Sequence, residues 1–238
     1  MSRRINQHGR TKEAMFSLCQ QLHDAVATGI RNRWAKLIVV ALSFVPAVAL
    51  LWATSDRSLH PDAGRLLTRQ TGNWALTFLI LTLAISPLRR LLDLPDMIRF
   101  RRALGLFAFL YGFLHIAAWR TFKLGHELYI GSLTKWSLRI GFFGFVLMIP
   151  LAATSTDRWV RWLGGKRWRA LHSLTYPSLV AAVVHCCLLP NTWIWELVMY
   201  SAAATLLLLI RLKTAFAAGT EKTKSRNERE CGSLARKE

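Results

Sequence analysis

Six long apolar segments dominate this sequence and constrain its fold more than any other feature. A helix needs about 20 predominantly apolar residues to cross the hydrocarbon core of a bilayer. Most of the six approach that length. The second is shorter, and it extends to Leu88 only if Ser86 and Pro87 are included. We therefore predict an all-α polytopic membrane protein, a bundle of six transmembrane helices. The expected helices cover residues 35–53, 74–86, 103–119, 136–153, 170–189 and 193–210.

Composition agrees with a membrane protein and excludes several other classes. The 238 residues are 53% hydrophobic and yet carry a formal charge of +19, as expected for apolar spans with basic flanks. So high an apolar content excludes disorder for most of the length. The four cysteines form neither a CxxC pair nor a zinc-like spacing, which excludes a disulfide scaffold. No aromatic and basic soluble module suggests nucleic-acid binding.

The basic residues fall mainly on one side of the predicted membrane. The connections expected on one side carry 24 of the 32 Lys and Arg residues, against 6 on the other side, and Lys36 and Arg139 lie within spans. By the positive-inside rule, the richer side is cytoplasmic. Both termini are then cytoplasmic. The richer segments are 1–34, 87–102, 154–169 and 211–238; the poorer ones are 54–73, 120–135 and 190–192.

This topology divides the chain into three parts. Residues 1–34 form a basic cytoplasmic tail, whose apolar residues at helical spacing favour an amphipathic helix as much as a solvated tail. Residues 35–213 form the six-helix domain, and residues 214–238 a charged, disordered cytoplasmic tail. The longest loop has about 20 residues, whereas a nucleotide-binding domain needs on the order of 100. Any activity must lie within the helices and at their ends.

Few ionisable residues lie inside the expected spans. Arg139 and Glu196 each lie about three residues inside the outer end of a helix, where they can pair or simply face the interface. The expected midplane holds no Asp, Glu, Lys or Arg, which disfavours an ion-coupled transporter.

Three histidines lie in apolar helices, and neutral imidazole is a common axial ligand of haem. His115 and His185 each lie four residues from the outer end of their helix, so both are about 6 Å below the outer boundary and could bind one haem between them. His172 lies about 20 Å deeper than His185 on the same helix. Pro177 lies between these two histidines and should kink the helix. A single histidine in such a helix is otherwise more often a packing residue.

These histidines and three longer strings resemble a known family. Two histidines thirteen apart on one helix, facing a third, resemble ferric-reductase-like transmembrane cytochromes. The strings TGNWAL…ISPLRR (71–90), RRALGLFAFLYGFLHI (101–116) and TSTDRWVRWLGGKRWRALHSLTYP (154–177) are similar to the MsrQ (YedZ) family, the haem-binding membrane subunits of a periplasmic methionine sulfoxide reductase system. The resemblance covers roughly residues 35–213.

The resemblance implies a function and a set of cofactors. Members of the family pass electrons from membrane quinone through one or two b-type haems to the periplasmic molybdopterin subunit MsrP, and are associated with FMN. The chain would then be an electron-transfer subunit that supports repair of oxidised periplasmic proteins, without being the catalytic subunit. The implied ligands of haem iron are His115, His172 and His185.

Other residues near the cofactors have two interpretations. Arg101, Arg102, Arg167 and Arg169 at the inner end could bind a haem propionate, a flavin phosphate or a quinone headgroup, or could only set topology and contact anionic lipid. Glycines such as Gly141 could let a helix or a porphyrin approach closely. The alternative functions are a small transporter or channel, and a non-catalytic membrane scaffold with packing histidines.

Overall fold

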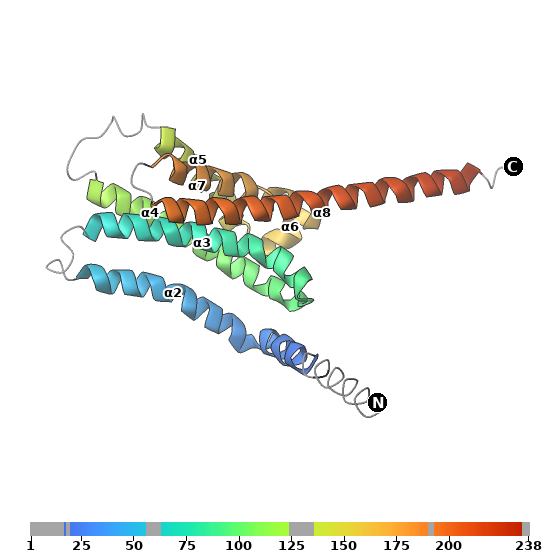
Figure 1. Ribbon diagram of the computed structural model, residues 1–238, viewed down its shortest axis with the longest axis horizontal. Helices are drawn as coiled ribbons and strands as arrows, with labels where there is room; N and C mark the ends of the chain where they lie inside the picture. The colour runs from blue at the N-terminus through green and yellow to red at the C-terminus, as the bar shows by residue number, and fades with distance from the viewer. Residues whose placement is uncertain (1–16, 18–19, 56–62, 124–135, 190–192, 235–238) are drawn as a thin grey trace, which may run out of the picture.

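The computed structural model of the chain describes residues 17, 20–55, 63–123, 136–189 and 193–234, and these described residues are almost entirely helical. Within the described part of the chain, six helical segments are long and apolar enough to cross a membrane, so the prediction of a six-helix, multi-pass membrane protein is confirmed. Both the N-terminal end of α2 and the extension of α8 lie at the same end of the bundle (Figure 1). We call this the inner end and the opposite one the outer end, following the sidedness expected from the basic residues. The elements are α2 (Arg33–Ser55), α3 (Ala63–Leu91), η1 (Pro95–Met97), α4 (Ile98–Lys123), α5 (Trp136–Ala153), α6 (Asp157–His172), α7 (Thr175–Cys187) and α8 (Ile194–Leu234).

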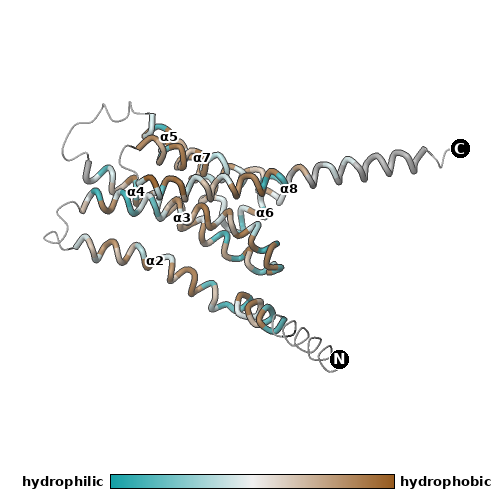
Figure 2. Tube along the Cα trace, viewed as in Figure 1, coloured by the Kyte–Doolittle hydropathy of each residue, from teal (hydrophilic) through white to brown (hydrophobic). Residues whose placement is uncertain are grey.

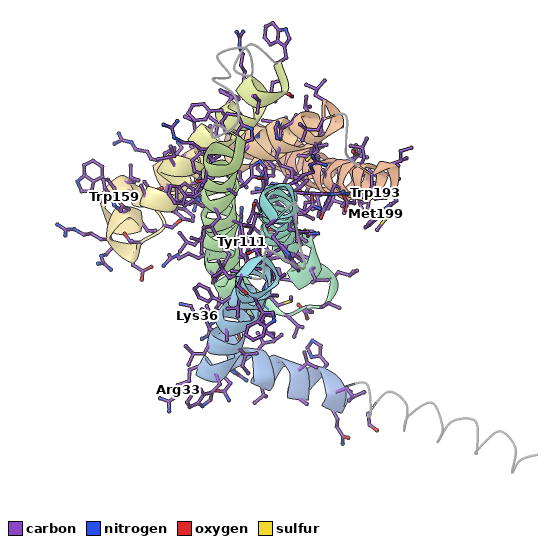
Figure 3. All side chains as sticks on the ribbon, turned by 90° about the vertical axis from the view of Figure 1, so that its left-hand side faces the viewer. Arg33, Lys36, Tyr111, Trp159, Trp193 and Met199 are labelled. Atoms are coloured by element: carbon purple, nitrogen blue, oxygen red, sulfur yellow. The ribbon has the colours of Figure 1, made fainter. Side chains whose placement is uncertain are left out.

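The centre of the bundle is the packing of α3 against α4, with α5 and α7 forming a second close pair. Tyr111 of α4 is fully buried and stacks on Phe78 of α3, with ring centroids 5.2 Å apart. Its hydroxyl donates to the backbone oxygen of Ser43 in α2, at 2.9 Å, which ties that peripheral helix to the core. Figure 3 shows Tyr111 between the helices, with Trp159 and Trp193 at opposite edges.

Hydrophobic residues cover most of α2, α5, α7 and the bundled part of α8 (Figure 2). Many of them face outward, as Leu51 and Trp52 of α2 do. In a soluble protein such exposure would mark an interaction surface. In a six-span bundle it is the surface that faces lipid.

Helix α3 begins eleven residues earlier than the sequence suggested, so part of the expected outer segment 54–73 is helical. Four threonines in α3 donate their hydroxyls to backbone oxygens four residues earlier: Thr68 to Gly64, Thr71 to Leu67, Thr77 to Asn73 and Thr82 to Phe78. Such bonds satisfy polar side chains on their own helix. These bonds let the outer half of α3 be helical although it is polar. A search for long apolar segments assigns such a stretch to a loop.

The fifth span is two helices rather than one. The helical pattern breaks at Ser173 and Leu174, between α6 and α7. Pro177 explains the position, because a proline ring clashes with the carbonyl four residues earlier, here that of Ser173. The kink predicted from Pro177 is thus present. The prediction that residues 154–169 connect two helices is mostly wrong, because residues from Asp157 onward form α6. This helix has a non-helical kink at Gly164.

The two expected tails also contain helix. Residues 20–31 are helical and mostly exposed, whereas residues 1–16 lie outside the described part of the chain. At the other end, α8 continues to Leu234 and projects beyond the bundle (Figure 1). The charged composition predicts a disordered segment from residue 214, whereas the structure continues α8 through it to Leu234.

Candidate functional site

The structure brings His115 and His185 together near the outer end. His115 comes from α4 and His185 from α7, and both are half-buried. Their ring centroids are 6.2 Å apart, and the ring planes meet at 79°. The matched depths counted from the sequence therefore correspond to a real juxtaposition. We call these two residues the histidine pair.

The His115 ring is anchored to the backbone of α3. Its Nδ1 lies 2.7 Å from the backbone oxygen of Thr68. Because a carbonyl oxygen can only accept, Nδ1 must carry the proton, and Nε2 is left with its lone pair. Gly72 makes this approach possible: a Cβ at that position would lie 2.9 Å from Nδ1 of His115.

The His185 ring is anchored in the same way to α5. Its Nδ1 lies 2.6 Å from the backbone oxygen of Ser137, and a Cβ on Gly141 would lie 2.7 Å from that nitrogen. In both cases the glycine follows the accepting residue by four positions, one helical turn. A carbonyl on a helix surface is normally shielded by the side chain of the next turn, and glycine removes that shield.

This arrangement suits two imidazoles on opposite sides of one metal. A metal-to-imidazole bond is about 2.0 Å and the ring centroid lies about 1.1 Å beyond the nitrogen, so two such rings have centroids about 6 Å apart. The observed 6.2 Å agrees. Ligating histidines usually donate their other ring nitrogen to a carbonyl or carboxylate, as both do here. Two histidines alone fit a metal whose remaining ligands come from a macrocycle, as in haem. Among the described residues there is no group of three or more His, Cys, Asp or Glu that could hold a metal ion.

His172, the third predicted ligand, has different surroundings at the inner end. Its Nε2 lies 3.3 Å from the Thr154 hydroxyl, and its ring stacks on Trp168 with centroids 4.0 Å apart. Trp168 in turn donates to the backbone oxygen of Thr154, at 3.0 Å. Within the described part of the chain, no second histidine ring is in contact with His172.

The four arginines named from the sequence separate into two groups. Arg101 is half-buried and lies 3.5 Å from the hydroxyl of Ser86, whereas Arg102 is exposed and forms an ion pair with Asp157 at 2.6 Å. Arg167 and Arg169 are exposed on α6. Only Arg101 therefore lies among the bundle helices.

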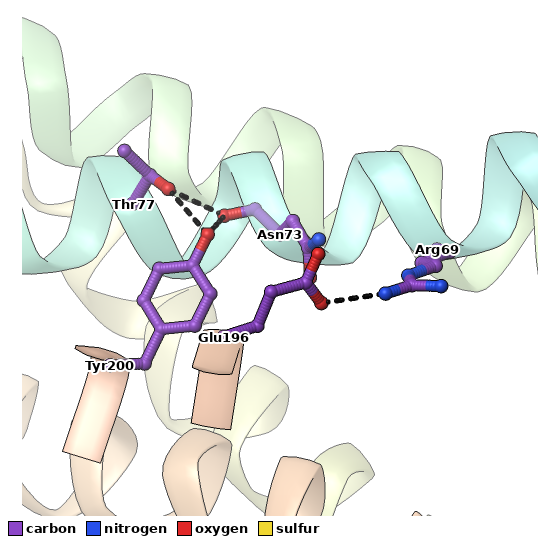
Figure 4. Close-up of polar contacts among 5 residues, drawn as sticks. All are labelled: Arg69, Asn73, Thr77, Glu196 and Tyr200. Atoms are coloured by element: carbon purple, nitrogen blue, oxygen red, sulfur yellow. Dashed lines mark hydrogen bonds and ion pairs between the residues drawn. The ribbon is translucent and has the colours of Figure 1, made fainter. Parts of the chain in front are cut away.

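A row of polar contacts joins α8 to the outer half of α3, the helix that anchors His115 (Figure 4). Arg69 forms an ion pair with Glu196 at 2.9 Å, and the Tyr200 hydroxyl lies 3.1 Å from that of Thr77 and 3.5 Å from the backbone oxygen of Asn73. From the sequence, Arg139 was one possible partner of Glu196. The structure pairs this acid with Arg69, because the segment that carries Arg69 is part of α3.

Sequence reasoning missed Thr68, Gly72 and Ser137, although it noted Gly141 among the glycines that permit close approach. The detectable signal is a hydroxyl residue followed four positions later by glycine, once in each helix that faces a histidine. That signal is weak without the fold, since small residues are common in membrane helices.

Two comparisons with known proteins bear on this site. The profile of the family described as "Ferric reductase like transmembrane component" matches residues 71–183. The match includes His115 and His172 and ends two residues before His185. The six-helix fold and this match define the class: a multi-pass helical membrane protein with a ferric-reductase-like transmembrane component.

Curated relatives narrow the class to one family. A protein of Ralstonia nicotianae is 42% identical over 64% of this chain and 72% of its own length. A protein of Xanthomonas euvesicatoria is 37% identical over 73% of this chain and 84% of its own length. A protein of Brucella anthropi is 36% identical over 76% of this chain and 83% of its own length. All three are named protein-methionine-sulfoxide reductase heme-binding subunit MsrQ. The chain belongs to the MsrQ family.

Proposed function

We propose that this chain is a haem-b-binding electron-transfer subunit of a methionine sulfoxide reductase system. The observation that carries the proposal is the histidine pair, with its 6.2 Å spacing and with both Nδ1 atoms committed to backbone carbonyls. The names of the relatives, which describe a heme-binding subunit, support it. His115 and His185 are the residues that would hold the haem iron.

The chain's own residues orient the two ligands before any cofactor binds. Thr68 and Ser137 accept the Nδ1 protons, so the Nε2 of each neutral ring keeps its lone pair for a ligand. Haem b, when bound, supplies a one-electron carrier. Fixing the tautomer and orientation in advance lowers the cost of binding it, because less conformational freedom is lost.

The finer parts of the proposal follow from the family resemblance. The electrons come from the membrane quinone pool, pass outward across an inner membrane, and reach the periplasmic molybdopterin subunit MsrP, with FMN as a further cofactor. His172 and the inner arginines belong to the electron-input side, where His172 ligates a second haem or shapes the input site. The docking surface for MsrP would be formed by the outer connections 54–73 and 120–135, of which residues 56–62 and 124–135 lie outside the described part of the chain.

The decisive experiment combines a spectrum with a sidedness assay. The detergent-purified chain, expressed with ample haem, should show a Soret band and sharp reduced α and β bands. A colourless protein would favour a transporter or a scaffold with packing histidines. In vesicles supplied with reduced quinone, MsrP should be reduced only from the outer face. Reduction only from the cytoplasmic face would overturn the proposed direction and partner.

A further inference from the structure

Three arginines from three different helices lie near one another at the inner end of the bundle. Arg89 lies in the last turn of α3, Arg101 in the first turn of α4, and Arg211 in α8, where its guanidinium lies over the Tyr176 ring of α7. We call these three residues the arginine cluster. Arg101 contacts Ser86, which lies one turn before Arg89 on α3, and Arg89, Arg211 and Tyr176 are all within electrostatic reach of Arg101.

The arginine cluster has few polar partners within the protein. Arg211 places its guanidinium 5.8 Å from the centre of the Tyr176 ring, and Arg101 reaches only the hydroxyl of Ser86, at 3.5 Å. The Nε of Arg89 is buried without a hydrogen-bond partner. Among the described residues, no member of the cluster forms an ion pair.

This differs from two other arginines that bridge helices, Arg69 and Arg102. Arg69 and Arg102 each meet a carboxylate at 2.9 Å or less. A buried N–H donor without an acceptor is costly, and so are neighbouring charges of one sign. A cluster that combines both features is stabilised when an anion supplies the missing acceptors and charge.

We infer that the arginine cluster binds a phosphate group. Planar guanidinium groups match the oxygens of phosphate and bind them in bidentate fashion. The site lies at the inner ends of α3, α4 and α8, beside exposed apolar residues such as Leu91 and Leu212. A phosphate at this position comes either from the headgroup of an anionic phospholipid or from a soluble phosphate ester. The inference does not depend on the proposed haem function.

The test uses the full chain in nanodiscs. One lipid composition is neutral phosphatidylcholine, and the other contains phosphatidylglycerol. Native mass spectrometry counts retained phospholipid, and a thermal-unfolding titration with inorganic phosphate in neutral nanodiscs covers the soluble source. The variants are Arg89→Gln, Arg101→Gln and Arg211→Gln. The controls are Arg90→Gln on α3 and Lys213→Gln on α8, which replace exposed cations near the cluster in sequence.

We expect each cluster variant to bind the anion about tenfold more weakly, and both controls to bind as the unchanged chain does. Retention of phosphatidylglycerol identifies a lipid headgroup, and a phosphate-dependent rise in unfolding temperature identifies a soluble ester; either supports the site. Arg211→Gln keeps the test valid if the more buried variants misfold. Equal loss in controls and cluster variants would overturn the inference. The inference would also be overturned if the cluster variants lose bound haem but bind the anion as the unchanged chain does.

Discussion

The two ends of the bundle hold histidine in contrasting ways. At the outer end, the histidine pair uses one nitrogen of each ring for a backbone carbonyl, so the other two nitrogens are available to a ligand. At the inner end, the Nε2 of His172 lies near the Thr154 hydroxyl and the ring stacks on Trp168. The outer pair therefore keeps one nitrogen of each ring available to a ligand, whereas the ring of His172 is held by contacts with Thr154 and Trp168. The predictions below test that difference.

The largest effect is expected from removing either member of the histidine pair. Changing His115 or His185 to Ala leaves one imidazole without its opposite partner, so bound haem should fall to background and electron delivery should stop. Haem per chain, measured by pyridine haemochrome assay, checks this. Full haem retention in either variant would contradict the pairing.

Filling the space that glycine leaves should weaken the same site without removing a ligand. In Gly72→Ala and Gly141→Ala, a methyl group meets a histidine ring at under 3 Å, so the ring must leave its carbonyl. Loss of such a supporting contact typically costs about 10- to 100-fold in metal affinity. We expect a comparable loss of haem affinity and altered low-spin signals in electron paramagnetic resonance.

The matched control for the glycine variants is Gly105→Ala. A Cβ at that position would meet only Thr82, at an ordinary contact distance of 3.6 Å. If Gly105→Ala changes haem affinity as much as Gly72→Ala does, the effect reflects general loss of helix packing. The close approach to the histidine rings would then have no special role.

Removing His172 sharpens the contrast between the two ends. We expect His172→Ala to keep the outer haem and to lower quinol-driven electron transfer. A fall in haem per chain would assign His172 to a second haem, whereas an unchanged count with slower quinol oxidation would assign it to the input site. If haem content, quinol oxidation and partner reduction all stay normal, His172 is only a packing residue beside Trp168.

The smallest effect is expected at the contacts between α3 and α8. Glu196→Gln keeps the shape and removes the charge that pairs with Arg69, whose side chain is one-third exposed. The free energy of unfolding should fall by about 1 kcal/mol, while haem affinity changes little because the histidine pair is anchored by other atoms. Denaturant unfolding measures the first quantity and haem titration the second. A large loss of haem would show that α8 supports the outer site.

Counting helix lengths in the sequence was enough to place His115 and His185 at one depth, because depth in a membrane helix depends only on distance from its end. It did not reveal their anchors. Arg69 and the polar residues around it made the outer half of α3 resemble a loop, so Thr68 and Gly72 were not seen as part of a helix facing His115. For the same reason Arg139 seemed the available partner for Glu196. Patterns of apolar residues do not detect polar groups that are satisfied by their own helix.

The use of main-chain oxygens to anchor the histidine pair has a consequence for evolution. Residues 68 and 137 contribute an atom that every amino acid possesses, so these positions are free to drift among residues that keep the helix. At positions 72 and 141 the site requires that no Cβ be present, which only glycine provides. Beyond the two histidines themselves, selection on this site should therefore fall on Gly72 and Gly141, which contribute no side chain. A survey of natural variation would find these two glycines more strongly constrained than Thr68 and Ser137.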